Sequence, residues 1–262
     1  MVKTRLDSLL VERGLYESRT RAAAAVMAGE VRLGPTRGQG KPGQLVPDDV
    51  DLTVDRGPAY VSRGGVKLAN ALAALSLEVS GRACLDVGAS TGGFTDCLLQ
   101  RGASSVTTVD VAYGALDWRL RGDPRVTVLE RTNARSRSPE DLSYLPDLIV
   151  IDVSFISLAK VLPAVLGCAA EPFDCLALVK PQFEVGRARV GKGGVVRSAD
   201  DRRAALTAVG ACARGLGFSV VDFVSSGLPG PAGNRESFIW IRPGGDPGAA
   251  ESIDAAARRA EP

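Results

Sequence analysis

The stretch from Asp86 to Phe94 constrains the fold of this chain more than any other part of the sequence. It reads Asp-Val-Gly-Ala-Ser-Thr-Gly-Gly-Phe, follows a short apolar run and leads into a helix-like segment that ends near Gln100. Glycine adopts backbone conformations that other residues avoid, and it lets a ligand approach the main chain closely. The stretch therefore predicts a strand, a tight turn and a helix. The turn would lie at the carboxyl end of a parallel strand, where open α/β sheets bind ligands.

The glycine spacing separates two cofactor classes. A dinucleotide-binding turn uses Gly-x-Gly-x-x-Gly at the start of a helix, and the glycines at 88, 92 and 93 do not fit that spacing. The pattern apolar-Asp-apolar-Gly-x-x-x-Gly-Gly is instead typical of S-adenosylmethionine (SAM) methyltransferases, in which the glycines leave room for the methionine half. A second strand at 105–110 ends in Asp110, which is placed to bind ribose hydroxyls. The alternative is an ordinary strand, turn and helix with a glycine corner.

The rest of the chain shows the strand and helix pattern of a large α/β domain. At 262 residues the chain can hold one large and one small domain. The apolar run at 148–152 is uninterrupted, as expected for a strand buried on both faces of a parallel sheet. We therefore predict an α/β fold with a Rossmann-like, mostly parallel, seven-stranded sheet. The predicted strands are 83–87, 105–110, 126–130, 148–152, 175–180, 218–224 and 237–241, and the predicted helices are 63–75, 92–100, 113–120, 158–166 and 199–215.

A small α+β module is predicted before this domain. Leucines 6, 9 and 10 recur at helical spacing, and Ser18 is a plausible N-cap for a second helix at 19–28. Short strands at 31–33 and 50–54 flank a Gly/Pro-rich hairpin at 34–43. The predicted domains are this small module at 1–57, a linker at 58–61, a methyltransferase domain at 62–243 and a tail at 244–262 that we expect to be a frayed helix.

Charge is unevenly distributed, although the net charge is only +2. Residues 1–41 carry eight Lys or Arg against four acids, and residues 187–214 carry seven against two. A local excess of positive charge favours a polyanionic partner. The pattern around Arg5, Arg19 and Arg21 resembles the small RNA-binding module of ribosomal protein S-four, which implies that these arginines face RNA phosphates. The alternative is that both stretches are solvated surfaces.

Composition excludes several kinds of site. The chain has no histidine, so a histidine triad, general base or metal ligand is excluded, and we expect no metal site. Its five cysteines are scattered in apolar contexts, which indicates small buried residues and not a disulfide framework. The first residues contain no apolar signal core, and no apolar run approaches the roughly 20 residues of a membrane span. We expect a cytoplasmic protein with no membrane partner.

Charged side chains end or follow apolar strands at the predicted ligand edge of the sheet. They are Asp152, Lys180 and Glu236, and Lys67 lies on the helix that opens the large domain. Each alone has a structural explanation, because a strand-end aspartate is often an N-cap and a strand-end lysine is often just solvated. Together they suit methyl transfer to a ribose 2′-hydroxyl, which is a poor nucleophile until its proton is removed. A lysine in suitable surroundings can take that proton, while carboxylates hold the lysines and orient the sugar.

Eight motifs spread over about residues 3–242 resemble one known family. They are Ser62-Arg63-Gly64-Gly65-x-Lys67-Leu68, Asp86-Val87-Gly88-Ala89-Ser90-Thr91-Gly92-Gly93-Phe94, Asp117-Trp118-Arg119-Leu120-Arg121, Glu130-Arg131-Thr132-Asn133, Asp152-Val153-Ser154-Phe155-Ile156-Ser157, Val179-Lys180-Pro181-Gln182-Phe183-Glu184, Gly191-Lys192-Gly193-Gly194-Val195-Val196-Arg197 and Gly233-Asn234-Arg235-Glu236. In combination they are similar to the TlyA (haemolysin-A-like) family of ribosomal RNA cytidine 2′-O-methyltransferases, which are related to the FtsJ enzymes.

The resemblance implies a tetrad of Lys67, Asp152, Lys180 and Glu236, with Lys180 as the proton acceptor. It also implies SAM as the cosubstrate and cytidine in ribosomal RNA, within subunits or ribosomes, as the target. Members act on the large subunit alone or on both subunits, and loss of the latter is associated with resistance to capreomycin-type antibiotics. The residues implied to bind SAM are Asp86, Gly88, Ala89, Ser90, Gly92, Gly93, Phe94, Asp110, Val111 and Asn133. The residues expected to contact RNA are Arg5, Arg19, Arg21, Arg63, Arg187, Arg189, Lys192 and Arg197.

Three other functions remain as alternatives. A catalytically silent ribosome-assembly factor would bind RNA and SAM without turnover. A membrane-lytic haemolysin would need amphipathic or spanning segments, and none is found that is not better explained as core. A dinucleotide oxidoreductase would need a different glycine spacing.

Overall fold

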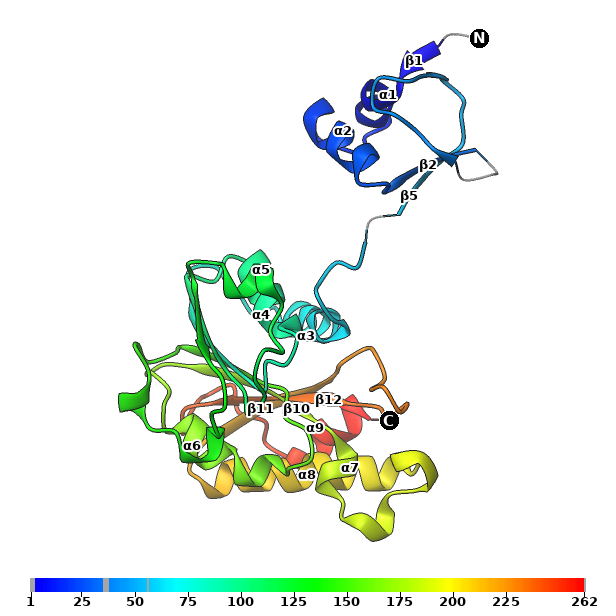
Figure 1. Ribbon diagram of the computed structural model, residues 1–262. Helices are drawn as coiled ribbons and strands as arrows, with labels where there is room; N and C mark the ends of the chain where they lie inside the picture. Colours follow the sequence, from blue (N-terminus) through cyan, green and yellow to red (C-terminus); the bar gives the residue numbers. More distant parts are fainter. Residues whose placement is uncertain (1–2, 35–37, 56, 262) are drawn as a thin grey trace. The chain divides into compact units, whose positions relative to one another are not determined.

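The computed structural model describes residues 3–34, 38–55 and 57–261, which fold as two compact units (Figure 1). The first unit is Met1–Ala59 and the second is Tyr60–Pro262. Each unit has hydrophobic core residues of its own. The division between the units falls inside the segment 58–61 that we expected to be a linker, and it does not separate the tail at 244–262 from the second unit.

The first unit packs two short helices against short antiparallel strands. Helix α1 (Leu6–Glu12) and helix α2 (Arg19–Met27) bury one apolar face each. The side chain of Ser18 accepts a hydrogen bond from the main chain of Arg21 at 3.3 Å, so the predicted N-cap is confirmed. The strands are β1 (Lys3–Arg5), which pairs with β4 (Leu45–Pro47), and β2 (Val31–Leu33), which lies between β3 (Gly38–Gln39) and β5 (Leu52–Val54).

Sequence reasoning missed β1, β3 and β4, because these two- or three-residue strands lack the apolar alternation that identified β2 and β5. Residues 35–37 of the predicted hairpin, including the basic residue Arg37, lie outside the described residues.

The second unit is built on one seven-stranded sheet with the order β11-β12-β10-β9-β6-β7-β8. Strand β12 is antiparallel to both of its neighbours, β11 and β10. The five strands from β10 to β8 in this order run parallel to one another. The predicted α/β class with a mostly parallel, seven-stranded sheet is therefore confirmed. The strands are β6 (Ala83–Val87), β7 (Ser105–Val109), β8 (Val126–Leu129), β9 (Leu148–Ile151), β10 (Asp174–Val179), β11 (Ser219–Ser225) and β12 (Ser237–Arg242).

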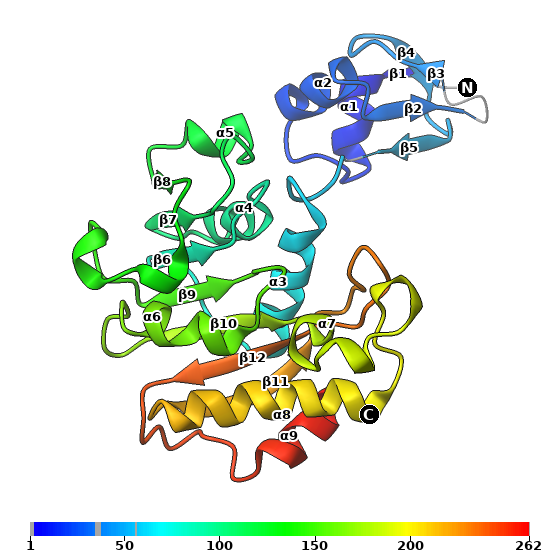
Figure 2. The same cartoon turned by 60° about the horizontal axis from the view of Figure 1, so that its bottom comes forward.

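Helices cover both faces of this sheet (Figure 2). Alternate residues of each central strand belong to one of two core clusters, as expected for strands buried on both sides. One face carries α3 (Arg63–Ala74), α4 (Gly93–Gln100) and α5 (Trp118–Arg121), and the other carries α6 (Leu162–Leu166), α8 (Ala199–Gly215) and α9 (Ile253–Ala260). The short helix α7 (Pro181–Glu184) follows β10, and the 3₁₀ turns are η1 (Ala134–Ser136), η2 (Pro139–Asp141), η3 (Leu158–Lys160), η4 (Arg187–Arg189) and η5 (Lys192–Gly194).

Three expected helices differ from the structure. The helix expected at 113–120 is shortened to α5, which begins only at Trp118. It begins late because Gly114 has a left-handed φ of +71° and the carboxylate of Asp117 accepts the Arg119 N–H at 2.9 Å as an N-cap. The helix expected at 158–166 divides into η3 and α6, with Pro163 in the first turn of α6, where its missing N–H costs least. The tail expected to fray instead ends in α9, which buries Ala256 and Ala257 in the core.

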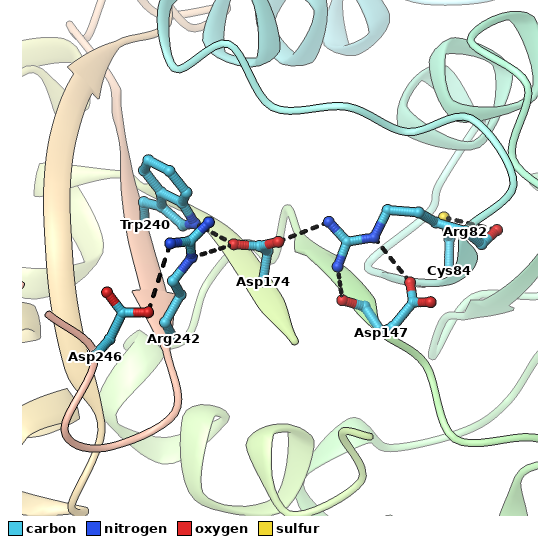
Figure 3. A network of polar contacts seen from close by, with 7 residues as sticks. All are labelled: Arg82, Cys84, Asp147, Asp174, Trp240, Arg242 and Asp246. Atoms are coloured by element: carbon cyan, nitrogen blue, oxygen red, sulfur yellow. Dashed lines mark hydrogen bonds and ion pairs between the residues drawn. The ribbon is translucent and has the colours of Figure 1, made fainter. Parts of the chain in front are cut away.

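The edge of the sheet where the parallel strands begin is held by a charged network (Figure 3). Arg82, just before β6, donates to the carboxylates of Asp147 at 2.9 Å and Asp174 at 2.6 Å. Asp174, at the start of β10, also accepts from Trp240 Nε1 and Arg242 Nε of β12, each at 2.7 Å. These bonds fix the strands at the edge opposite their carboxyl ends, where the predicted site lies.

Candidate active site

The turn after β6 brings three segments of main chain unusually close together. Gly88 has a φ of +84°, and a β-carbon on it would come closer than 3.0 Å to the carbonyl oxygen of Asp152. A β-carbon on Gly93 would likewise meet the main chain of Gly65 and the hydroxyl of Ser62 at the start of α3. The glycines of the motif are therefore required for close packing at the carboxyl ends of β6 and β9.

A cleft of about 430 Å³ lies beside this turn and contains the whole predicted tetrad. Lys67 comes from α3, Asp152 follows β9, Lys180 follows β10 and Glu236 precedes β12. Because the carboxyl ends of the parallel strands meet at one edge of the sheet, residues far apart in the sequence converge here. We call this the lysine cleft; it is lined by Ser62, Arg63, Gly64, Lys67, Gly88, Ala89, Ser90, Thr91, Gly93, Phe94, Asp152, Lys180, Pro231 and Glu236.

The tetrad forms two ion pairs of different exposure. Lys67 and Glu236 pair with each other, and both are almost fully buried. The Nζ atom of Lys180 lies 2.6 Å from Asp152 Oδ1 and donates to Ser154 Oγ at 2.8 Å. This outer pair is partly exposed, so it is the pair that a substrate entering the cleft can reach.

A second cavity of about 510 Å³ lies at the carboxyl ends of β6, β7 and β9 and is lined by Asp110, Val111 and Asn133. We call it the Asp110 cavity. Asp110 Oδ2 accepts the N–H of Ser90 at 2.7 Å, and its Oδ1 accepts the N–H of Ala112 at 2.8 Å. A carboxylate has about four acceptor positions, so Asp110 can still bind two hydroxyl groups.

The two cavities share Gly88, Ser90 and Asp152. A ligand with a diol at one end and a reactive group at the other can therefore span both. Of the other residues predicted to bind SAM, Ala89, Gly93 and Phe94 line the lysine cleft, and Val111 and Asn133 line the Asp110 cavity. The residues of the Asp110 cavity suit a nucleoside. The carboxylate of Asp110 offers acceptor oxygens for a ribose, and apolar side chains such as Ile156 can contact a base.

Two residues predicted to bind SAM line neither cavity. Asp86 is fully buried, and its Oδ2 accepts the N–H and the hydroxyl of Thr95 at 2.9 and 2.6 Å. Burial raises the pKa of Asp86 to about 7, and its Oδ1 has no hydrogen-bond partner in the part of the chain that the structure describes. Gly92 packs under Leu116 and Leu120. Both residues hold the turn in place, and a direct contact of either with SAM stays a prediction.

The residues predicted to contact RNA lie in both units. Arg63 lines the lysine cleft, and its guanidinium donates to the carbonyl of Pro229. In the first unit, Arg5 and Arg19 lie 2.7 and 3.7 Å from the carboxylate of Asp7, and Arg21 pairs with Glu17 at 2.7 Å. The remaining four, Arg187, Arg189, Lys192 and Arg197, are exposed on the segment between α7 and α8.

Sequence reasoning missed an aromatic pair beside the outer ion pair. Phe155 is 91% exposed, has a left-handed φ of +63° and lines the Asp110 cavity. Its ring centroid lies 5.3 Å from that of Phe183. Glu184 accepts the hydroxyl of Ser157 at 2.6 Å and so ties α7 to the loop after β9. The motifs at 152–157 and 179–184 contain these residues, but nothing in the sequence indicates that Phe155 points outward.

Comparison with family models decides what kind of site this is. The model of the FtsJ-like methyltransferases matches residues 60–242, which include both cavities and the whole tetrad. The chain belongs to the FtsJ-like methyltransferase family. The first unit of this FtsJ-like methyltransferase lies wholly outside the matched residues.

Relatives extend the similarity beyond the matched domain. The 16S/23S rRNA (cytidine-2′-O)-methyltransferase TlyA of Mycobacterium tuberculosis is 52% identical over 92% of this FtsJ-like methyltransferase and 90% of that protein. Hemolysin A of Brachyspira hyodysenteriae is 37% identical over 88% of this chain and 97% of that protein. A solved structure from Streptococcus thermophilus, which carries a provisional hemolysin name, is 40% identical with a TM-score of 0.72 and covers 99% of this chain and 96% of its own. The resemblance to the TlyA and FtsJ enzymes is therefore confirmed.

The described residues contain neither a metal-binding cluster nor a membrane-spanning helix. Within residues 3–34, 38–55 and 57–261 of this FtsJ-like methyltransferase, no group of three or more His, Cys, Asp or Glu could hold a metal ion. Over the same ranges, no helix combines the length and the apolar character needed to cross a bilayer.

Proposed function

We propose that this protein transfers the methyl group of SAM to the ribose 2′-hydroxyl of a cytidine in ribosomal RNA. The observation that carries the proposal is the contact between Lys180 and Asp152 at the place where the lysine cleft joins the Asp110 cavity. The substrate is supported by the name of the relative with 52% identity, which acts on cytidine in both subunits. The target is then RNA within subunits or ribosomes, and the enzyme works in the cytoplasm, where ribosomes are found.

The cavities divide the binding of SAM between them. Asp110 would hold the two ribose hydroxyls, while Asn133 and Val111 flank the base. The turn at Gly88 and Ser90 would hold the methionine half, because its main chain is open to both cavities. When bound, SAM supplies an electrophilic methyl group on a sulfonium, so the residues of the protein have to supply alignment and a proton acceptor.

Lys180 is the residue placed to accept the proton of the 2′-hydroxyl. The proton passes to Nζ as the sugar oxygen forms its bond to the methyl carbon, and the bond from that carbon to sulfur breaks. A lysine accepts a proton only in its neutral form, so Nζ must lose a proton before each turnover. The groups that contact Nζ and can take part in this loss are Asp152 and Ser154. The buried pair of Lys67 and Glu236 forms the rigid inner wall of the cleft.

Phe155 is suited to hold the base of the target nucleotide. A base whose ribose enters the cleft must leave its stack, and an aromatic side chain can replace the lost stacking. The exposed ring of Phe155 lies three residues after Asp152 and is supported by Phe183. This places a stacking surface next to the residues proposed for the chemistry.

The basic residues outside the cleft would grip the RNA backbone. The first unit, proposed as a ribosomal-protein-S-four-like module, offers Arg5, Arg19 and Arg21, all of them exposed. The segment between α7 and α8 offers four more basic side chains. Contacts of this kind would give affinity that falls steeply with salt.

Methyl transfer from labelled SAM to 30S, 50S and 70S particles that lack the modification tests the proposal. A 2′-O-methylcytidine mapped in either subunit is the expected product and identifies the substrate at the same time. If SAM binds but no particle is methylated, the proposal fails in favour of a catalytically silent assembly factor.

A further inference from the structure

Two large aromatic side chains are exposed outside both cavities. Trp118 is 79% exposed and Tyr113 is 71% exposed. Both lie in the segment between β7 and β8, where the motif at 117–121 has no part in the proposed chemistry. Large apolar side chains that stay exposed on one segment of a chain can mark an interaction site.

Trp118 is held on the surface by one leucine just before α5 and one on it. Leu116 and Leu120 are buried, and both reach the space above Gly92, where a β-carbon would come closer than 3.0 Å to either of them. These two leucines fix the inner side of the short helix, so Trp118 stays on the outer side. The indole is therefore presented by a rigid element that is packed on the glycine turn of the lysine cleft.

The second aromatic ring is already covered on one side by an arginine. The guanidinium carbon of Arg131 lies 4.3 Å from the ring centroid of Tyr113. Arg131 has a left-handed φ of +52°, which is strained for a residue with a side chain. Glu130 accepts the N–H of Gly114 at 2.9 Å and pairs with Arg121 of α5. Glu130 thus links the loop that carries Tyr113 to the helix that carries Trp118.

Charge and position favour RNA as the occupant of this surface. Residues 111–135 contain five arginines and three acids, an excess of two positive charges. Val111 and Ala112, which line the Asp110 cavity, come directly before Tyr113. Exposed aromatic rings flanked by arginines are how proteins hold unpaired nucleotides, because rings stack on bases and arginines contact phosphates.

We propose that Tyr113, Trp118 and Arg131 form a stacking surface for unpaired nucleotides near the target cytidine, with Arg119 and Arg121 contacting the phosphates. We call these residues the aromatic face. The inference rests on the proposed function only in that the substrate is RNA. Loss of one stacked base lowers affinity by roughly 5- to 100-fold.

Tryptophan fluorescence gives a direct test, because the chain has only two tryptophans. In a full-length Trp240→Phe variant, Trp118 is the one remaining tryptophan and therefore the one source of tryptophan emission. We expect single-stranded RNA to quench it, a duplex of the same sequence to quench it much less, and a base-free polyphosphate to leave it unchanged at equal salt. Equal quenching by polyphosphate, or none by single-stranded RNA, overturns the inference. If Trp240→Phe does not fold, the difference between wild type and Trp118→Phe gives the same signal.

Methyl transfer separates stacking from a structural role. We expect Trp118→Ala to raise the KM for ribosomal particles about tenfold, with kcat and SAM affinity unchanged. Trp118→Phe should stay close to wild type, because a ring remains. Leu145→Ala removes another exposed apolar side chain of the second unit and is the matched control.

The outcomes distinguish this inference from the proposed function. If the wild type methylates particles but Trp118→Ala has an unchanged KM, only the aromatic face is wrong. If Trp118→Ala weakens binding to particles while naked RNA does not quench Trp118, the face binds a ribosomal protein and the inference is overturned. If the wild type methylates nothing, the proposed function fails, and the quenching titration still decides whether the face binds RNA.

Discussion

Gly88 lies so close to the main chain of Asp152 that a β-carbon on it would come within 3.0 Å of the Asp152 carbonyl oxygen. The two residues follow the neighbouring parallel strands β6 and β9, and each lines both cavities. The close approach of the two main-chain segments that line both cavities therefore depends on the absence of a side chain at residue 88.

We expect Gly88→Ala to weaken SAM binding strongly and to destabilise the fold. The φ of +84° costs an alanine about 1–2 kcal/mol, and displacing the Asp152 main chain adds about 1–3 kcal/mol. Calorimetric titration with SAM and urea unfolding measure the two effects. Gly217→Ala is the matched control, since Gly217 has a φ of +90° but no atom of the described residues within 4 Å of the β-carbon position. SAM binding by Gly88→Ala equal to that of the control would show that this close approach does not shape the site.

Replacing Lys180 tests the proposed proton acceptor. We expect Lys180→Ala to lower kcat by about 10²–10⁴-fold and to leave SAM binding within a few-fold, because Lys180 lines the lysine cleft and not the Asp110 cavity proposed for the nucleoside of SAM. Lys180→Arg keeps the charge beside Asp152 but cannot accept the proton, so it should be nearly as slow. Lys160→Ala, which removes an exposed lysine outside both cavities, should be fully active. Normal turnover by Lys180→Ala would remove Lys180 from the mechanism.

Much of the site could be predicted because strand ends are visible in the sequence. The apolar runs before Asp152 and Lys180 identify two buried parallel strands, and such strands end at one edge of a sheet. The convergence of Asp152 and Lys180 follows from this topology, whereas the addition of Lys67 on α3 and Glu236 before β12 is implied by the family resemblance. The topology does not predict which lysine pairs with which carboxylate. The ion pairs of Lys67 with Glu236 and of Lys180 with Asp152 depend on the path of each loop.

The features that could not be predicted depend on single backbone conformations or on distant partners. The outward position of Phe155 comes from its left-handed φ, and no periodicity encodes that angle. The expected helix at 113–120 failed because a glycine conformation and an aspartate cap delay its start to Trp118. The Arg82 and Asp174 network joins side chains 92 residues apart in the chain, which a local pattern cannot show.

The buried pair of Lys67 and Glu236 allows stability and activity to be separated. Removing one partner leaves the other charge buried and unpaired, so Lys67→Met or Glu236→Gln alone should lower the free energy of unfolding by about 3–5 kcal/mol. The double variant should recover part of that loss, since it buries no charge. It should still be inactive, because the inner wall of the cleft is changed. Urea unfolding and methyl transfer on all three proteins measure this, and an active double variant would restrict the pair to folding.

The proposed RNA grip of the first unit can be measured by its salt dependence. We expect Arg5, Arg19 and Arg21, changed together to Gln, to weaken RNA binding and to reduce the slope of log K against log salt by up to about 3. Arg5 and Arg19 also neutralise Asp7, which is only 4% exposed. The hydrogen bond from Arg5 is the main reason that the pKa of this carboxyl lies below its usual value. Asp7→Asn is therefore added to the triple variant and is also tested alone. An unchanged slope would mean that RNA is gripped elsewhere.

The buried carboxyl of Asp86 gives the fold a specific pH dependence. Burial raises its pKa from 3.8 to about 7, and the charges of Asp152 and Asp110 act in the same direction, while hydrogen bonds from Thr95 oppose them. Because the folded pKa lies above the unfolded value, the folded state binds the proton more tightly. This group therefore costs no stability below about pH 4, costs progressively more as the pH rises to about 7, and costs a constant amount above that.

Asp86→Asn should remove this dependence, since the amide has no proton to lose. Relative to wild type, the variant should gain stability as the pH rises from 4 to 7, by an amount on the order of a few kcal/mol. Urea unfolding at half-unit pH intervals measures the difference, in which the titration of other groups cancels. A difference that stays constant across this window would show that Asp86 is already ionised in the folded protein at pH 4. Its Oδ1, which has no hydrogen-bond partner among the described residues, would then have to bind a group outside them.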